Sequence, residues 1–338
     1  MPAVSVLMPC YNAAGTLDEA LDSLARQTFS DFEIIALEDG STDSTPAILQ
    51  SWANHDPRLQ TISQPHSGII AALNTGLRLC QAPYIARMDT DDRSHPERLR
   101  RQVDYLDAHP DVTVVGCLVE GFPPAQVRQG FRIYIDWLNS LVTDDDIRRE
   151  MFIESPLAHP SVVFRREAVT QAGGYQEHGW PEDYDLWLRL YLAGARFGKV
   201  PEVLLEWREH PERLTRTDPR YSLENFLRAK VHYLAQGPLL GRQAVFIWGA
   251  GMVGRRLSKH LQRLGLPLAA FFDIDPRKIG HTRRGLPVLS PEELPAWWTR
   301  YQKPALLAAV GARGARQIIR QRLVNFGLVE GLDWWSVA

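Results

Sequence analysis

Strand-like and helix-like segments alternate along the first third of the chain. Short apolar runs recur, and each is followed by a segment whose apolar residues are three or four positions apart. The first pattern predicts buried strands, and the second predicts helices that pack along one face. The predicted strands are 4–8, 32–37, 59–63 and 84–88, and the predicted helices are 17–27, 45–54, 69–80 and 96–109. This order predicts an α/β fold with a mainly parallel sheet covered by helices.

The pattern is less regular after residue 110. The predicted elements there are strands at 112–119, 162–164 and 203–207 and helices at 181–193 and 221–235. Residues 121–150 mix aromatic and charged residues without a clear period. A second strand and helix series begins near residue 244, after the turn-forming GPLLG at 237–241. We therefore expect a large domain over 1–220, a helical linker over 221–242 and a small α/β domain over 243–338.

Charge and cysteine usage narrow the class of protein. The net charge is −2 overall, which gives no reason to expect a nucleic-acid partner. Residues 243–338 carry 14 Lys and Arg against 6 Asp and Glu, a net charge of +8, so the remainder carries −10. The asymmetry either helps two domains to dock or reflects solvated surface. Three widely spaced cysteines indicate a reducing, cytoplasmic setting, and neither a signal peptide nor a membrane span is expected.

Three carboxylates follow the predicted strand 84–88 within four positions: Asp89, Asp91 and Asp92. Like charges repel, so either this is a solvated acidic turn or something positive binds there. A hard divalent ion prefers oxygen ligands and often bridges carboxylates to substrate phosphates. Ligands of parallel sheets bind beyond the carboxyl ends of the strands, and both Glu38-Asp39 and the 89–92 turn lie at such ends. Position therefore favours a cation site.

Five motifs together resemble family 2 glycosyltransferases over roughly residues 3–220. They are VSVLMPCYN with the following EDGSTDST, GIIAALNTGLRLCQAPYIARMDTDD, ESPLAHPSVVFRREAVTQAGGY, WPEDYDLWLRL and WREHPERLT, in that order. The resemblance implies a GT-A fold and an inverting, metal-dependent transferase that uses a nucleotide-diphosphate sugar. It also implies that the acidic turn is the DxD motif of the family.

The resemblance assigns donor-side residues by position. They are Pro9, Tyr11, Glu38, Asp39, Gly68, Asn74, Asp89 and Asp92. Asp39 would bond the uracil edge, and Glu38 stands where Asp is more usual, on the ribose side. Family members often carry an Arg near the donor where this chain has Leu73. Arg87 is an alternative for that role, or it pairs with neighbouring acids.

The metal and the general base also follow from the resemblance. Asp91 is the first choice as ligand of Mn²⁺ or Mg²⁺, with Asp92 a rival, and His210 either completes the shell or lies on the surface. Asp183 of PEDYDLW would take the acceptor proton, with Glu182 on the acceptor side. The alternative is that both acids serve the helix N-terminus, which favours negative charge.

Two other groups of residues have two interpretations each. His159 lies near the acceptor pocket or braces its loop. Tyr134, Trp137 and Asn139 either receive the acceptor sugar or, for Trp137 preferentially, pack in the core.

The C-terminal part carries the GxGxxG pattern Gly249, Gly251 and Gly254, between an apolar strand and a helix, and Asp273 follows 19 residues later. This is the spacing of a dinucleotide-binding fingerprint, so residues 243–338 are predicted to be Rossmann-like. Such a module either binds a nucleotide or serves structure and partner docking.

Three functions compete at this point. The first is a transferase that moves a sugar, from UDP by preference, to a hydroxyl of a glycan or lipid-linked acceptor in surface polysaccharide synthesis. The others are an NAD(P)-dependent oxidoreductase and a nucleotide-binding regulatory protein, both built on the C-terminal domain. The resemblance favours the first, with a cytoplasmic enzyme that could associate peripherally with the inner face of the membrane.

Overall fold

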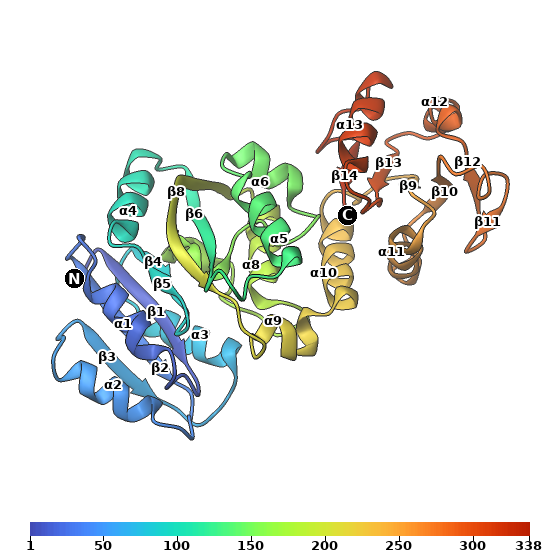
Figure 1. Cartoon of the computed structure of the whole chain (residues 1–338). Coiled ribbons are helices and arrows are strands. Elements are labelled where there is room, and N and C mark those ends of the chain that lie inside the picture. The colour runs from blue at the N-terminus through green and yellow to red at the C-terminus, as the bar shows by residue number, and fades with distance from the viewer. The chain divides into compact units, whose positions relative to one another are not determined.

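The computed structural model describes all residues from 1 to 338, and the chain forms two compact units. The first unit comprises residues 1–147, 156–178 and 182–219, and the second comprises 148–155, 179–181 and 220–338. Figure 1 colours the chain from blue to red along its length and labels the elements. None of the helices combines the length and the hydropathy that crossing a bilayer requires.

The first unit is built on an eight-stranded sheet in the order β3-β2-β1-β4-β7-β6-β8-β5. Its strands are β1 (Val4–Cys10), β2 (Phe32–Glu38), β3 (Leu59–Ser63), β4 (Tyr84–Arg87), β5 (Arg93–Ser94), β6 (Val112–Phe122), β7 (Val163–Arg165) and β8 (Arg196–Arg208). Strands β3, β2, β1 and β4 pair in parallel, as do β6 and β8. Only β7 and β5 pair antiparallel with their neighbours. The predicted fold class, a mainly parallel α/β sheet, is confirmed.

Helices cover both faces of this sheet (Figure 1). The helices in this part of the chain are α1 (Leu17–Ala25), α2 (Thr45–Ala53), α3 (Ile69–Leu79), α4 (Arg98–Ala108), α5 (Gln129–Asn139), α6 (Asp144–Glu150), α7 (Arg166–Gln171), α8 (Glu182–Leu192) and α9 (Leu214–Thr217), with a 3₁₀ turn η1 (His159–Ser161). Val6 of β1 shares one buried cluster with Leu21 of α1 and Leu99 of α4. Helix α3 covers the opposite face, where a Cβ added to Gly76 would lie 2.2 Å from Leu7 Cδ1. Glycine at position 76 therefore permits this close helix-to-sheet packing.

Parallel pairing brings the acidic strand ends together. Cys10 and Glu38 pair at the ends of β1 and β2, and β4, which ends at Arg87, pairs with the other side of β1. The Asp39 N–H donates to the Cys10 carbonyl at 2.9 Å. Burial raises the pKa of the Cys10 thiol, and the charges of Glu38 and Asp89 raise it further. Both acidic groups therefore lie around the carboxyl end of β1.

Residues 121–150, which lack a clear period in the sequence, form α5 and α6. Asn139 uses both ends of its side-chain amide on the Val119 backbone of β6, at 3.0 and 2.8 Å. Leu138 is fully buried, and Trp137 packs partly buried against the same core. These contacts join residues distant in sequence, so no local pattern could predict them. They give Asn139 and Trp137 a packing role.

The second unit has a six-stranded sheet in the order β11-β12-β10-β9-β13-β14. Its elements are β9 (Val245–Trp248), β10 (Leu268–Phe272), β11 (Thr282–Arg283), β12 (Leu286–Leu289), β13 (Ala305–Ala308), β14 (Trp334–Ser336), α10 (Leu223–Gln236), α11 (Met252–Arg263), α12 (Leu294–Trp298), α13 (Ala315–Asn325), η2 (Pro219–Tyr221) and η3 (Pro291–Glu293). All pairs except β11 with β12 are parallel. This is the Rossmann-like arrangement that the glycine pattern predicts. Most of the predicted linker forms α10, a helix of this unit.

Two short segments predicted in the large domain pack with the second unit instead. Glu150 is 4% exposed and accepts from Arg316 at 2.5 Å and Arg320 at 2.8 Å. The Lys230 ammonium, also buried, donates to the Ile153 carbonyl at 2.5 Å. In the other segment, Trp180 packs on His232 of α10, with ring centroids 5.3 Å apart. The apolar pattern could not reveal these contacts, because they are ion pairs, a backbone acceptor and a ring contact between residues distant in sequence.

A buried lysine in β8 predicts a pH-dependent stability. Lys199 is fully buried, its ammonium donates to the Leu138 carbonyl, and burial lowers its pKa from 10.5 to about 7. Between pH 7 and 10, Lys199 is therefore neutral in the folded protein and protonated in the unfolded chain. The free energy of unfolding should rise with pH in that window, by at most about 1.4 kcal/mol per pH unit, and stay flat below it.

Thermal melts of Lys199→Met at pH 7, 8 and 9 check this expectation. The variant should lose the rise in melting temperature, and the exposed control Lys303→Met should keep it. A Lys199→Met protein with the wild-type pH profile would show that the amine is not responsible.

Candidate active site

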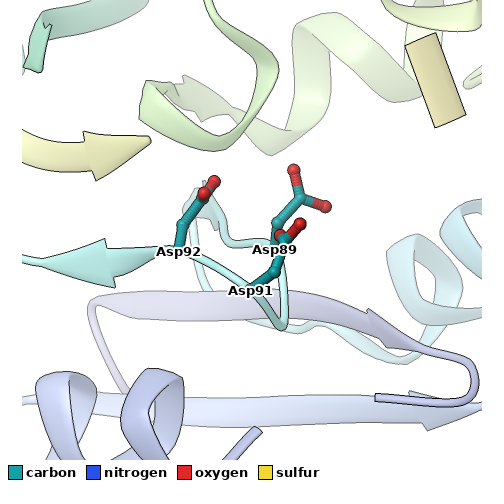
Figure 2. A group of neighbouring side chains, drawn as sticks. All are labelled: Asp89, Asp91 and Asp92. Carbon is teal, nitrogen blue, oxygen red and sulfur yellow. The ribbon is translucent and has the colours of Figure 1, made fainter. Parts of the chain in front are cut away.

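Three carboxylates crowd the turn between β4 and β5. One oxygen each of Asp89, Asp91 and Asp92 lies within 4.8 Å of the other two. Figure 2 shows the three side chains pointing to the same side of the turn. The side chains of Asp89 and Asp91 are 32% and 28% exposed, whereas Asp92 is buried. The first two acids can therefore meet a ligand from solvent, whereas Asp92 is enclosed by the protein.

Each of these acids has one cationic or N–H partner. The contacts are Arg87 Nη1 to Asp89 Oδ1 at 2.6 Å, His210 Nε2 to Asp91 Oδ2 at 2.8 Å, and the Arg208 backbone N–H to Asp92 Oδ1 at 2.8 Å. The other oxygen of Asp92 is buried and has no hydrogen-bond partner. An unpaired buried carboxylate oxygen is costly, so the turn offers an acceptor that the fold leaves unused.

The electrostatics of the turn disfavour three negative charges. Burial raises the pKa of Asp92 well above its ordinary value, and the charges of Asp91 and Asp89 add to this. Burial also raises the pKa of Asp89 despite the opposing charge of Arg87. The bond to Asp91 raises the pKa of His210. Carboxylate oxygens with one imidazole suit Mn²⁺ or Mg²⁺, so these residues fit a hard divalent ion.

Arg87 pairs with the acidic turn, and the charge of Glu182 at the start of α8 also acts on it. It is 2% exposed and its guanidinium contacts Asp89. Burial lowers the pKa of Arg87, but the charges of Asp89, Tyr175 and Glu182 outweigh this effect and raise it. Burial, with the charge of Arg87, lowers the pKa of His159 well below its ordinary value. A neutral imidazole therefore lies beside a buried cation.

His159 in turn connects to the acidic helix start. Its Nε2 lies 2.8 Å from the Tyr175 hydroxyl, and its Nδ1 lies 4.0 Å from Glu182 Oε1. Burial raises the pKa of Tyr175, and the charges of Glu182 and Asp183 contribute. His159 thus links Tyr175 to Glu182, and the charge of Arg87 acts on both His159 and Tyr175.

Two acids of α8 occupy different environments. Asp183 is half-buried, and one of its carboxylate oxygens accepts the Tyr184 N–H at 2.7 Å. Asp185 is fully buried and pairs with Arg189 at 2.8 Å. Asp185 therefore holds the helix in place, while Asp183 is partly exposed to solvent.

The Asp39 carboxylate organises the loop before α3. It accepts the Ser67 N–H at 3.0 Å, the Gly68 N–H at 2.9 Å and the Gln64 side-chain amide at 2.6 Å. His66 Nδ1 lies 2.9 Å from its second oxygen. Sequence reasoning assigned Asp39 to a nucleobase and did not expect this use of its oxygens.

The other donor-side residues border the same strand ends. Tyr11 is 46% exposed and stacks on His66 with ring centroids 4.1 Å apart. Glu38 accepts the Ser41 N–H at 2.5 Å, and Pro9 lies in β1 beside β2. Asn74, in contrast, bonds both the N–H and the carbonyl of Tyr175, at 2.9 and 2.8 Å. Its observed contacts brace the Tyr175 loop.

Sequence reasoning missed two arginines of this site. Arg98 is 1% exposed and donates to the Arg87 carbonyl at 2.8 Å without a carboxylate partner. Its only signal was its place on the buried face of α4, four positions before Gln102, which it also contacts at 3.0 Å. Arg208 holds the turn at Asp92. Its only signal was its place two residues before His210.

The glycine pattern of the second unit has the geometry of a tight strand-to-helix turn. A Cβ at Gly254 would lie 1.9 Å from the Gly249 carbonyl oxygen, whereas nothing lies near a Cβ at Gly251. Asp273 is buried, accepts the Ala250 N–H at 2.8 Å and pairs with Lys278 at 3.1 Å. Its carboxylate thus already stabilises the turn that a nucleotide would approach.

Comparisons with known proteins agree on one family. A family model described as Glycosyl transferase family 2 matches residues 5–172. The amylovoran biosynthesis glycosyltransferase AmsE of Erwinia amylovora is 35% identical over 207 residues, which are 60% of this chain and 75% of that protein. The Escherichia coli UDP-Gal:alpha-D-GlcNAc-diphosphoundecaprenol beta-1,3-galactosyltransferase is 28% identical over 236 residues, 69% of this chain and 83% of that protein.

A solved structure supports the fold. The mannosyltransferase PcManGT of Pyrobaculum calidifontis, in complex with GDP-Man and Mn²⁺, superposes with a TM-score of 0.52 at 23% identity. The match covers 70% of this chain and 62% of that one.

Proposed function

The chain belongs to glycosyl transferase family 2, and on that premise we propose that it is a metal-dependent, inverting enzyme of surface polysaccharide synthesis. It transfers a sugar from a nucleotide-diphosphate donor to a hydroxyl group of a glycan acceptor. The observation that carries the proposal is the acidic turn of Asp89, Asp91 and Asp92, with Asp89 paired to Arg87, in the same unit as Glu182 and Asp183 of α8. Donor-side and acceptor-side carboxylates of such an enzyme need to face one substrate.

The acidic turn would hold Mn²⁺ or Mg²⁺. Asp91 and His210 are the proposed ligands, and Asp89 and Asp92 line the same point. A bound divalent ion would stabilise the negative charge that develops on the departing diphosphate. Arg87 bonds Asp89 and Arg208 bonds the Asp91 carbonyl, and the metal would add a positive charge that faces the donor.

Asp183 is the proposed general base. The acceptor hydroxyl oxygen attacks the anomeric carbon, the bond from that carbon to the diphosphate oxygen breaks, and the hydroxyl proton passes to the Asp183 carboxylate. The Asp183 side chain is half-buried, which suits a group that meets a bound acceptor. Glu182 is buried and lies 4.0 Å from His159, which suits a residue that orients the acceptor side.

Donor, acceptor and location are finer parts of the same proposal. We propose UDP as the nucleotide and a lipid-linked glycan as the acceptor, and the printed name of the Escherichia coli galactosyltransferase includes both a UDP sugar and a diphosphoundecaprenol lipid. Such an acceptor would bring a cytoplasmic enzyme to the inner face of the membrane. Pro9, Tyr11 and Glu38 are the residues proposed to line the nucleotide pocket with Asp39 and Gly68.

A calorimetric screen tests the donor. UDP, GDP and dTDP sugars are titrated with and without Mn²⁺, and slow donor hydrolysis is followed in parallel. One nucleotide should bind at least about tenfold tighter with Mn²⁺, a gain of about 1.4 kcal/mol, and release its diphosphate. Failure of all three to bind or hydrolyse in the presence of Mn²⁺ would overturn the proposal.

The oxidoreductase alternative is not favoured. Asp273 is the acid expected to bind the ribose of a dinucleotide. Its carboxylate instead accepts hydrogen bonds from the Ala250 N–H and the Lys278 ammonium. A second nucleotide in this unit would therefore be held through the open backbone at Gly251. Incubation with NADH or NADPH should give no oxidation, and measurable turnover of either would revive the alternative.

A further inference from the structure

Arg208, the last residue of β8, contacts the acidic turn at two points. Its backbone N–H donates to Asp92 Oδ1 at 2.8 Å, and its side-chain Nε donates to the backbone carbonyl of Asp91 at 2.6 Å. One residue from a strand far along the chain thus binds both consecutive acids. The turn cannot rotate Asp91 without breaking the side-chain bond.

The guanidinium of Arg208 is itself held from three sides. Its Nη2 donates to Glu19 Oε2 of α1 at 2.5 Å. Its central carbon lies 4.3 Å from the Phe122 ring centroid, and Arg93 stacks on the same ring at 4.7 Å. Arg93 also donates two bonds to the same Glu19 oxygen, at 2.9 and 2.7 Å. The side chain of Arg208 is 14% exposed, and these contacts together restrict its position.

We propose that Arg208 is a positioning residue that presets the acidic turn for its divalent cation, with Glu19 fixing the guanidinium. The inference rests on the proposed metal-dependent function. The Arg208 backbone bonds only one oxygen of Asp92. The second oxygen of Asp92 has no hydrogen-bond partner, and Asp92 shares the turn with the oxygens of Asp89 and Asp91. Presetting means that the cation meets its ligands without first ordering the chain, which lowers the free energy cost of binding.

The role requires arginine rather than any cation. Nε and Nη2 point in different directions of one plane, so they reach Asp91 and Glu19 at once while the flat face stacks on Phe122. A lysine keeps the positive charge but offers a single ammonium group. If Arg208 acted only as a counter-charge to the acids, lysine would replace it.

The test measures Mn²⁺ binding and not activity alone. Mn²⁺ is titrated into the full-length protein with UDP or GDP present, and the paramagnetic resonance signal reports free Mn²⁺. Arg208→Lys and Arg208→Gln should both weaken Mn²⁺ affinity by about 10- to 100-fold, the range found for residues that orient metal ligands. Glu19→Gln should weaken it less, by about three- to tenfold. The control Arg101→Gln, which breaks a surface pair with Glu202, should bind as wild type.

Kinetics separate positioning from general damage. In Arg208→Lys the Mn²⁺ concentration for half-maximal transfer should rise, and excess Mn²⁺ should restore kcat to within about threefold of wild type. Wild-type Mn²⁺ affinity in Arg208→Lys would overturn the inference while leaving the proposed function intact. A wild-type protein that retains no Mn²⁺ would overturn both. If Arg208→Gln does not fold, the lysine and Glu19 variants still decide between these outcomes.

Discussion

Replacement of Asp183 by Asn should lower kcat by about 10²- to 10⁴-fold and leave donor affinity within about twofold of wild type. The amide keeps the shape and the acceptance of the Tyr184 N–H, but it cannot take the hydroxyl proton. The change therefore removes an interaction made in the transition state and spares ground-state binding. Single-turnover transfer rates and calorimetric titration of the donor measure the two quantities separately.

The second carboxylate of the same helix provides the matched control. Asp185 is fully buried and paired with Arg189, so Asp185→Asn should lower the melting temperature and spare the chemistry of the folded enzyme. Opposite signatures at positions 183 and 185 would separate the base from a structural acid. Wild-type kcat in Asp183→Asn would refute the base assignment, because an amide cannot take the acceptor proton.

Replacement of Asp91 by Asn should weaken Mn²⁺ binding and lower transfer by about 10²-fold or more, the cost of removing one group that stabilises transition-state charge. Asp91 is the acid of the turn that is both exposed and bonded to an imidazole. Loss of one negative ligand reduces the attraction for a divalent ion. Mn²⁺ titration in the presence of UDP or GDP, followed by transfer assays over a range of Mn²⁺ concentrations, checks the prediction.

Metal removal and the neighbouring acid give the controls. Chelation with EDTA should abolish wild-type transfer, and added Mn²⁺ should restore it. Asp92 is buried among like charges and accepts the Arg208 N–H, so Asp92→Asn, which keeps an oxygen for that bond, should lower the Mn²⁺ affinity without lowering the melting temperature. A chelated enzyme that keeps full activity would show that the acidic turn serves another purpose than metal binding.

Local patterns were sufficient for the architecture. Apolar runs followed by helical spacing predicted β1 to β4 and the helices between them nearly to the residue, because each element buries its own periodic face. The same patterns located Asp39 and Asp89 at strand ends, and parallel pairing then required those ends to share one edge. Residues 121–150 escaped prediction because their packing, such as Asn139 on Val119, depends on partners far along the chain.

The sequence by itself determined the order of strands and helices and which carboxylates stand at strand ends, since these follow from residue spacing, and its motifs carried the resemblance to the family. Only the tertiary structure decided which hydrogen bonds each acid accepts. Asp39 accepts from the loop before α3, Asp92 accepts from the Arg208 backbone, and Asp273 accepts from the glycine turn beside it. The tertiary structure also decided that the buried Arg87 pairs with Asp89. Hydrogen-bond partners and burial depend on contacts between residues that are far apart in the sequence, and local residue spacing does not determine those contacts.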